Sequence, residues 1–336
     1  MNDNQQLLDV LTREGVLVAV NVRYWRARKK LDAQDVGLDP DDVTERLISL
    51  GHKRLLPREA LAQFALIESR AHAVVDAATF PFLGGIGRFL PNRKLRETTV
   101  RLHELEAEFA KARRSFARRY ETLRKSAVAE WREAASKLVR DPARVVAAIE
   151  AGFPSADGLD RYFGFQTSLF QIRVPESLEP ELVAEGDRQA LVEARREAAQ
   201  RASSQIAEGV DAFVRDAVAS LREQTATLCE EMLASMREAK SGVHQKTLNR
   251  LVDFIDRFKQ LNFAGDAELE AQLDRARREL LSRTAVEYRD SATARRRLDA
   301  GIRDLADEAR RLAASDATRI VERFGQMGVR KITFAA

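Results

Sequence analysis

The residues with the most obvious chemical capacity are few and widely spaced. Glu68, His72 and Asp76 fall at i, i+4 and i+8, which would place two carboxylates and an imidazole on one helix face. Such a face suits a divalent metal, but no second His is nearby and the H-E-x-x-H pattern is absent. Because carboxylates flank a lone His by chance in a chain that is 32% charged, we expect no metal site.

Nucleophilic chemistry has no better support. No Ser or Cys stands on a glycine elbow, and the glycines of residues 84–87 match neither phosphate-binding spacing. Cys229 is the single cysteine, which excludes a disulfide framework and a Cys-based zinc module. Beside Leu228 and Met232 it fits a small buried side chain. We therefore expect no catalytic residues and no cofactor, and a reduced, cytoplasmic, non-enzymatic protein.

A basic stripe is the second candidate site. Residues 51–150 hold 20 basic and 12 acidic side chains, although the whole chain has a net charge of only +4. The stripe comprises Lys111, Arg114, Arg118, Arg119 and Lys125. On a helix, these side chains could face the phosphates of a nucleic acid. The alternative, which we favour, is a solvated helix face whose arginines pair with acidic residues on neighbouring helices or with Glu104, Glu108 and Glu121.

An apolar segment, ATFPFLGGIGRFLP at residues 78–91, is the third candidate. Segments that join helices are ordinarily polar, because a buried loop leaves backbone donors and acceptors without partners. One interpretation is an exposed tip that inserts into a partner's groove or a membrane interface. The other is that the segment folds back and completes a small sheet. The candidate tip residues are Phe80, Phe82, Leu83, Ile86, Arg88, Phe89 and Leu90.

Long helices must position these groups. All 8 prolines lie between Pro40 and Pro180, and proline interrupts helix interiors. Apolar residues at spacings of three and four predict one helix from about Asn92 to Leu138. A second stripe runs from Ile206 to Met236, and a third from Leu269 to Leu312, with a shorter amphipathic element at 248–258 between them. No apolar run approaches the ~20 residues of a membrane-spanning helix.

Three stretches favour strands. They are 15–25, 163–175 and 329–334, which are rich in β-branched and aromatic residues. If all three pair, a small sheet forms where the N-terminus, the middle and the C-terminus meet. The predicted fold is mainly α: an elongated antiparallel helical bundle or coiled coil of three or more long helices, with a small β-sheet at one end.

The predicted organisation is one elongated domain with five parts. Residues 1–91 hold a strand, short helices and the apolar loop, and 92–141 the first long helix. Residues 142–176 hold short helices and a strand, 177–315 a long helical coiled-coil region, and 316–336 a C-terminal helix and strand.

Five stretches carry a family resemblance: RYWRARKKL (23–31), SLGHKRLL (49–56), FLGG (82–85), LEAEFAKARRSFARRYETL (105–123) and FGFQTSLFQIRVP (163–175). Together they resemble a bacterial family known as domain of unknown function 3150. The resemblance implies a long helical protein, encoded on phages and mobile elements beside a MoxR-type AAA+ ATPase and a von Willebrand factor A protein. It brings no catalytic residues and no settled activity.

The expected function is therefore a non-enzymatic helical adaptor that acts with these two proteins. The apolar seams leave self-association open, since they serve intramolecular and intermolecular coiled coils alike. The alternative is a membrane-active, pore-forming or membrane-remodelling protein that uses Phe80 to Leu90. A weaker alternative is nucleic-acid binding through the arginine-rich helix.

Overall fold

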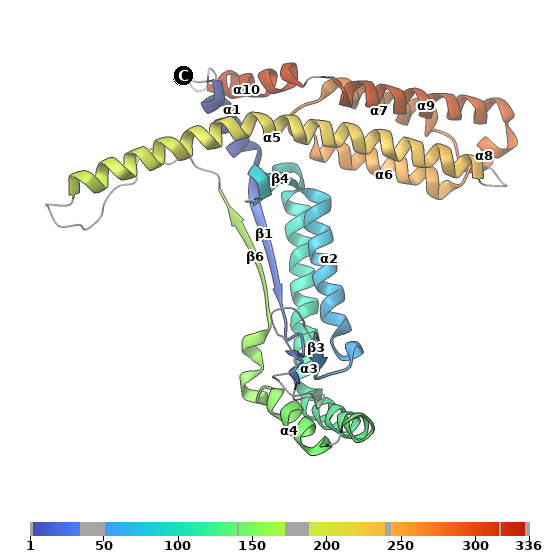
Figure 1. Ribbon diagram of the computed structural model, residues 1–336. Helices are drawn as coiled ribbons and strands as arrows, with labels where there is room; N and C mark the ends of the chain where they lie inside the picture. The colour runs from blue at the N-terminus through green and yellow to red at the C-terminus, as the bar shows by residue number, and fades with distance from the viewer. Residues whose placement is uncertain are drawn as a thin grey trace. The chain divides into compact units, whose positions relative to one another are not determined.

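A computed structural model describes residues 3–33, 51–85, 87–139, 141–171, 188–238, 243–315 and 317–332 (Figure 1). The chain divides into two compact units that interleave in sequence. Unit 1 comprises Met1–Val18, Ala78–Arg96 and Leu169–Ala336, and unit 2 comprises Ala19–Ala77 and Glu97–Ser168. Helices dominate both units, so the prediction of a mainly α protein is confirmed.

Unit 1 is built from helices that pack on α5. Its elements are α1 (Asp3–Glu14), β4 (Phe80–Phe82), η4 (Leu83–Gly85), β5 (Gly87–Pro91), α5 (Arg188–Glu238), α6 (Gln245–Leu261), α7 (Ala267–Leu280), α8 (Ala285–Asp290), α9 (Ala292–Ala313) and α10 (Thr318–Ile332). Helix α5 lies alongside α9 and α6, and α1 packs on α10 (Figure 1). The predicted short amphipathic element at 248–258 is α6, whose apolar residues are buried.

The seam between α5, α7 and α9 is aliphatic. On α9, Leu298, Ile302, Leu305 and Leu312 are at most 5% exposed, and on α7 Leu269 and Leu273 are fully buried. These residues recur every three or four positions, so burying one face of each helix closes the seam. Helices α5, α7 and α9 thus pack through the stripes that the sequence pattern indicates.

The third stripe is not one helix, because capping residues divide it. Thr284 caps α8 through a capping box with Glu287, and Ser291 caps α9 by accepting a hydrogen bond from the Ala294 backbone N–H. A cap satisfies backbone donors at a new helix start, so the chain changes direction there at little cost. The Thr-x-x-Glu spacing was the sequence signal for this division.

Unit 2 surrounds the long helix α3 (Asn92–Leu138), whose predicted bounds are confirmed. Most of the helix belongs to this unit. The other elements are β1 (Gly15–Arg23), β2 (Arg28–Lys30), β3 (His52–Arg54), η3 (Arg58–Leu61), α2 (Ala62–Ala78), α4 (Pro142–Gly152), η5 (Ala156–Gly158), η6 (Asp160–Tyr162) and β6 (Gly164–Phe170). Several of them extend a few residues past the unit boundary.

Aromatic rings fill the core of unit 2. The Phe64 ring lies 5.6 Å from Tyr24, 5.4 Å from Phe109, 5.8 Å from Phe116 and 5.0 Å from Phe163, measured between centroids. These separations fall in the range of favourable edge-to-face and offset ring contacts. Phe64 is therefore the hub through which α2, α3 and the segment before β6 pack together.

The larger sheet has the strand order β4-β5-β1-β6. Strand β1 pairs antiparallel with β5, with Gly15 opposite Pro91 and Val18 opposite Arg88. The predicted strands at 15–25 and 163–175 do share a sheet, as β1 and β6. The segment 78–91 supplies the other two strands.

The predicted C-terminal strand is wrong. Residues Val329–Ile332 continue helix α10, and 333–336 lie outside the described residues. The start of α10 buries Val321 and Phe324, three positions apart on one face. Once those turns have formed, extending a helix adds one hydrogen bond per residue, which outweighs the local strand preference of VRKI.

Candidate functional site

The apolar segment is not an exposed tip. Phe80, Phe82, Phe89 and Leu90 are each at most 5% exposed. The Phe82 ring lies 5.0 Å from Phe213 of α5. The hydrophobic effect favours this outcome, because four large apolar side chains leave water together. The interpretation that the segment folds back onto the sheet is confirmed, and the exposed-tip interpretation is wrong.

The remaining tip residues agree with this correction. Leu83 is half-buried and packs against the core of unit 1, close to Gly209. Arg88 is half-buried within β5, and Ile86 lies outside the described residues. Over the described part of the chain, no helix is both long enough and apolar enough to cross a lipid bilayer.

The basic stripe lies on α3 and faces solvent. Lys111, Arg114, Arg118 and Lys125 are exposed and share one helix face, since they are spaced by three, four and seven residues. Among the described residues, none of these four forms a hydrogen bond or ion pair. Arg119 points further round the helix and donates a 3.3 Å hydrogen bond to the Ser115 carbonyl. The expected pairing is thus absent from the described contacts of these five residues. Two other arginines of the same stretch do pair with acidic side chains, Arg113 with Asp160 at 3.8 Å and Arg124 with Glu121 at 3.9 Å.

Glu68, His72 and Asp76 do not come together as a metal-binding cluster in the described part of the chain. Glu68 accepts two hydrogen bonds from Arg26, at 3.0 and 2.6 Å, and forms an ion pair with it. His72 and Asp76 are exposed. Within the described residues, no group of three or more metal-binding side chains comes together.

Cys229 is a buried thiol, as expected. It is fully buried on α5, and burial raises the pKa of its thiol to about 12. The thiolate is the reactive form of cysteine, so this side chain is poorly suited to nucleophilic chemistry near neutral pH.

A groove between α5 and α6 is the candidate site that the structure adds. Its volume is about 470 Å³. Helix α5 contributes Ser220, Glu223, Gln224, Thr227, Leu228 and Glu231, and α6 contributes Arg250, Asp253, Phe254 and Arg257. Leu228 and Phe254 are buried, which gives the groove an apolar floor between polar walls.

Two carboxylates remain available in this groove. Arg250 forms an ion pair with Glu231 across the helices, and Arg257 lies 5.3 Å from the centre of the Phe254 ring. Glu223 and Asp253 form no hydrogen bond or ion pair with another described residue. The groove therefore offers two unpaired negative charges above an apolar floor.

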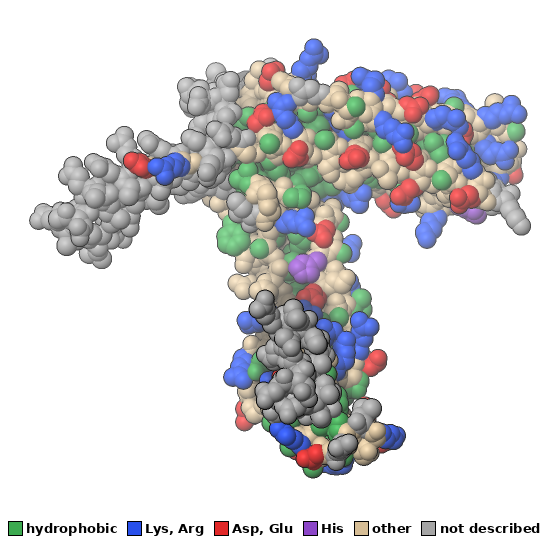
Figure 2. Space-filling view, viewed as in Figure 1, with side chains coloured by type: hydrophobic (Ala, Val, Ile, Leu, Met, Phe, Trp, Pro, Cys, Tyr) green, Lys and Arg blue, Asp and Glu red, His purple; other side chains and the backbone are tan. Residues whose placement is uncertain are grey.

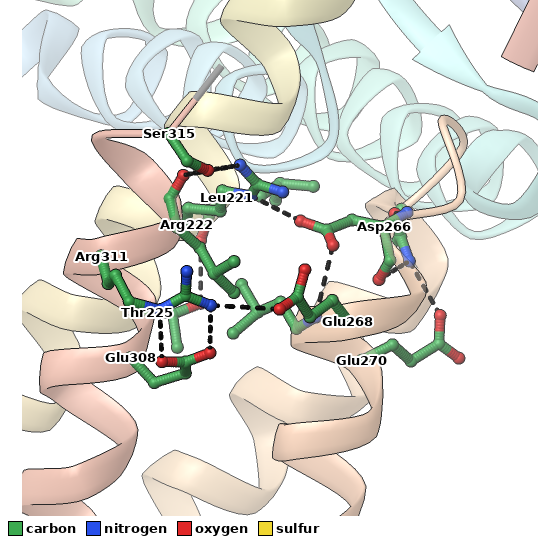
Figure 3. Close-up of polar contacts among 12 residues, drawn as sticks. Leu221, Arg222, Thr225, Asp266, Glu268, Glu270, Glu308, Arg311 and Ser315 are labelled. Carbon is green, nitrogen blue, oxygen red and sulfur yellow. Dashed lines mark hydrogen bonds and ion pairs between the residues drawn. The ribbon is translucent and has the colours of Figure 1, made fainter. Parts of the chain in front are cut away.

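A buried polar network holds the helix that carries this groove (Figure 3). The Arg222 guanidinium lies 2.7 Å from the Asp266 carboxylate, and both side chains are at most 4% exposed. Arg222 also donates to the Leu312 carbonyl at 2.6 Å. Asp266 in turn caps α7 by accepting a hydrogen bond from the Leu269 backbone N–H at 3.3 Å. The network ties α5 to the start of α7 and the end of α9.

A second, more exposed layer lies beside this network. Arg311 of α9 forms ion pairs with Glu308 at 2.7 Å and with Glu268 of α7 at 3.1 Å (Figure 3). On the face shown in Figure 2, positive and negative side chains alternate over α7 and α9. This surface of alternating charges differs from the α5–α6 groove, where two carboxylates have no partner among the described residues.

The sequence alone did not indicate the groove. Its α5 residues lie at spacings of three and four, which is also the pattern of an ordinary solvated helix face. Only the packing of α6 beside α5 turns that face into one wall of a groove. The unpaired state of Glu223 and Asp253 likewise depends on which cations the fold brings near.

The comparisons with known proteins give one match. A family model described as "Protein of unknown function (DUF3150)" matches residues 12–287. No curated protein and no solved structure matches the chain. The matched range includes the groove, the basic stripe and the buried aromatic core. Because the match covers most of the length of the chain, the chain belongs to the DUF3150 family of proteins of unknown function.

Proposed function

We propose that this protein is a non-enzymatic helical adaptor that binds a helix of a partner protein in the α5–α6 groove. The observation that supports this is the pair of exposed carboxylates, Glu223 and Asp253, above the buried Leu228 and Phe254. A partner helix with an apolar edge and one or two Lys or Arg residues complements such a surface.

The dimensions of the groove suit a helix. From Ser220 to Glu231 the α5 wall covers eleven residue steps, or about 16 Å at roughly 1.5 Å per residue. That length corresponds to about three helical turns, enough for anchors at i, i+3, i+4 and i+7. The buried Arg222–Asp266 pair fixes α5 beside the groove, so little ordering remains when a partner binds.

The proposed partners are a MoxR-type AAA+ ATPase and a von Willebrand factor A protein, as the family resemblance implies. In this proposal the ATPase supplies mechanical work, and this chain acts as its adaptor, substrate or effector. The partner helix that enters the groove belongs to one of these two proteins.

Co-expression tests the proposal. A tagged copy of this chain is expected to co-purify with the neighbouring ATPase or its von Willebrand factor A partner. Glu223→Lys combined with Asp253→Lys reverses both free charges, and should reduce recovery of the partner at least tenfold. Asp307→Lys is the matched control, because Asp307 is an exposed α9 carboxylate away from the groove.

Two results would contradict the adaptor proposal. One is a chain that purifies alone in the presence of both partners. The other is full recovery of the partner with the doubly reversed variant, provided that its circular dichroism spectrum matches that of the wild type.

A second candidate function is nucleic-acid binding through α3. The observation that favours it is the exposed, unpaired set Lys111, Arg114, Arg118 and Lys125 among the described residues. From Lys111 to Lys125 the stripe extends about 21 Å at roughly 1.5 Å per residue, which can reach several phosphates of one strand.

Salt dependence tests this second candidate. Binding of a duplex oligonucleotide should weaken steeply as salt rises, because each phosphate contact releases counterions. Changing Arg114, Arg118 and Arg119 to Ala should weaken binding and lower the slope of log affinity against log salt by about 2 to 3. Binding that is insensitive to salt, or equal in the triple variant, excludes the stripe as a phosphate-binding surface.

A further inference from the structure

The two-stranded ribbon β2–β3 in unit 2 consists entirely of basic residues and one histidine. Strand β2 reads Arg28, Lys29, Lys30 and strand β3 reads His52, Lys53, Arg54. In the antiparallel register, Arg28 lies opposite Arg54 and Lys29 opposite Lys53. Like charges directly opposite each other on neighbouring strands destabilise a sheet.

The central pair of this ribbon is the most unusual. Lys53 is only 7% exposed, and it interacts with other groups of the protein. Its cross-strand neighbour Lys29 is exposed, and directly opposite residues place their side chains on the same face of a ribbon. This face of the ribbon therefore concentrates positive charge.

A pocket of about 400 Å³ lies where this ribbon meets α4. Its basic lining residues are Lys29, Lys30, Lys53 and Arg144, and Asp32 is the one carboxylate among the described residues that line it. Lys30, Asp32, Lys53 and Arg144 also interact with other groups of the protein.

The opposite wall of the pocket is small and apolar. It is formed by Val145, Ala148, Ala151 and Gly152 on one face of α4. A Cβ at position 152 would lie 3.1 Å from a Leu55 methyl and 3.7 Å from the Lys29 side chain. At position 152, the absence of a side chain allows Leu55 and Lys29 to pack close to α4.

We propose that this pocket binds a phosphorylated small molecule of nucleotide size. The lysines and Arg144 bind its phosphate oxygens through charge-assisted hydrogen bonds. Asp32 accepts a hydrogen bond from a hydroxyl of the ligand, and the Ala148–Gly152 wall contacts its less polar part. The volume lies within the range of about 300 to 1,000 Å³ that is usual for small-molecule sites.

A small molecule fits the pocket better than a polymer does. Single-stranded nucleic acids bind through aromatic platforms along a groove, and none of the described residues that line this pocket is aromatic. The basic stripe of α3 shares no residue with the pocket lining, so the two surfaces can be tested separately.

Isothermal titration of the purified full chain with pyrophosphate and with ATP tests the proposal. We expect saturable binding of both with one site per chain. Lys29→Gln and Lys53→Gln should each weaken binding at least tenfold. Ala148→Met, which fills the apolar wall without changing charge, should weaken ATP binding more than pyrophosphate binding. Lys137→Gln is the control, since Lys137 is an exposed lysine of α3 that pairs with Glu133.

Three results would overturn the proposal. The first is no saturable binding of either probe. The second is binding that Lys29→Gln leaves unchanged, and this exposed residue keeps the test valid if Lys53→Gln fails to fold. The third is binding of a duplex oligonucleotide that Lys29→Gln weakens, at concentrations where neither pyrophosphate nor ATP binds. Loss of ATPase co-purification in the groove variants, with normal ATP titration, would affect only the adaptor proposal.

Discussion

The α5–α7–α9 seam of unit 1 and the aromatic core of unit 2 solve the same packing problem differently. The seam buries aliphatic side chains from long helices and places a charged pair, Arg222 and Asp266, among them. The core of unit 2 packs rings around Phe64, and its ion pairs lie at the surface, as in Arg26–Glu68. The seam therefore contains a buried ion pair, Arg222–Asp266, which we call the polar lock. The core of unit 2 is held together by the packing of its rings.

The difference follows from the surfaces that must meet. Aliphatic stripes on long helices can slide past each other by one turn with little change in contact, so a buried hydrogen-bonded pair can select one register. In unit 2, short elements of different types pack on α3. Flat rings fill the irregular spaces between them and have directional contacts, which help to select one arrangement.

Breaking the polar lock should have the largest effect on stability. Arg222→Ala leaves the Asp266 carboxylate buried without its partner, which costs about 4 to 5 kcal/mol of unfolding free energy. The measurement is urea denaturation followed by circular dichroism. Arg250→Ala removes an exposed pair with Glu231 and should cost at most about 1 kcal/mol. Equal losses in the two variants would show that burial does not distinguish these pairs.

Removing the aromatic hub should come next. Phe64→Ala leaves a cavity among four rings and costs about 3 to 4 kcal/mol by the same measurement. Phe170→Ala is the control, because Phe170 is 55% exposed at the end of β6. A loss of less than about 1 kcal/mol for Phe64→Ala would mean that the core of unit 2 repacks freely.

Removing one hydroxyl group tests how much a buried hydrogen bond adds to the stability that ring packing gives unit 2. Tyr120 is fully buried and donates a 2.6 Å hydrogen bond to the Pro154 carbonyl. Tyr120→Phe keeps the ring and should cost about 1 kcal/mol. A cost above about 3 kcal/mol would reveal a polar lock in unit 2 comparable to that of the seam.

Near neutral pH, the smallest expected effect is that of the titration of Cys229 in unit 1. Burial raises its pKa to about 12, whereas an exposed thiol titrates near about 8.5. Between these values the unfolded chain loses the thiol proton and the folded chain keeps it, so the free energy of unfolding falls as pH rises. In Cys229→Ala this decline should be shallower by up to ~1.4 kcal/mol per pH unit. Identical slopes in the two proteins would contradict the burial of the thiol.

Thiol labelling gives an independent measurement of the same burial. A thiol reagent should modify native Cys229 only at the rate at which the protein opens, and should modify the denatured chain at once. Fast labelling of the native protein would place Cys229 at the surface of α5.

Local patterns in the sequence predicted much of the fold. The periodic apolar residues of α3 gave its bounds, and the alternation in β1 identified a strand. The Thr284–Glu287 capping box was also present in the sequence, but the continuous stripe from Leu269 to Leu312 concealed it. The residues at the end of α10 favour a strand locally, so the sequence pattern indicated one there. In the structure, the helix that begins upstream continues through them.

The sites were harder to predict than the elements. The sequence pattern identified Lys111 and Arg114 as members of a basic helix face, and they do lie exposed on α3. It left open whether the Phe80 and Phe89 segment was exposed, because an apolar run has the same composition in a buried hairpin and in an exposed tip. Only its contacts with Phe213 and Phe263 settled this point.

The sequence by itself determined the mainly α class and the apolar faces of the helices, because hydrophobic periodicity is a pattern among residues a few positions apart. The tertiary structure alone decided that Lys29 faces Lys53 beside α4, that α6 forms a groove with α5, and that Arg222 meets Asp266. These partners are 24 or more residues apart or come from different elements. Their contacts depend on how the chain closes its loops, which no local pattern encodes.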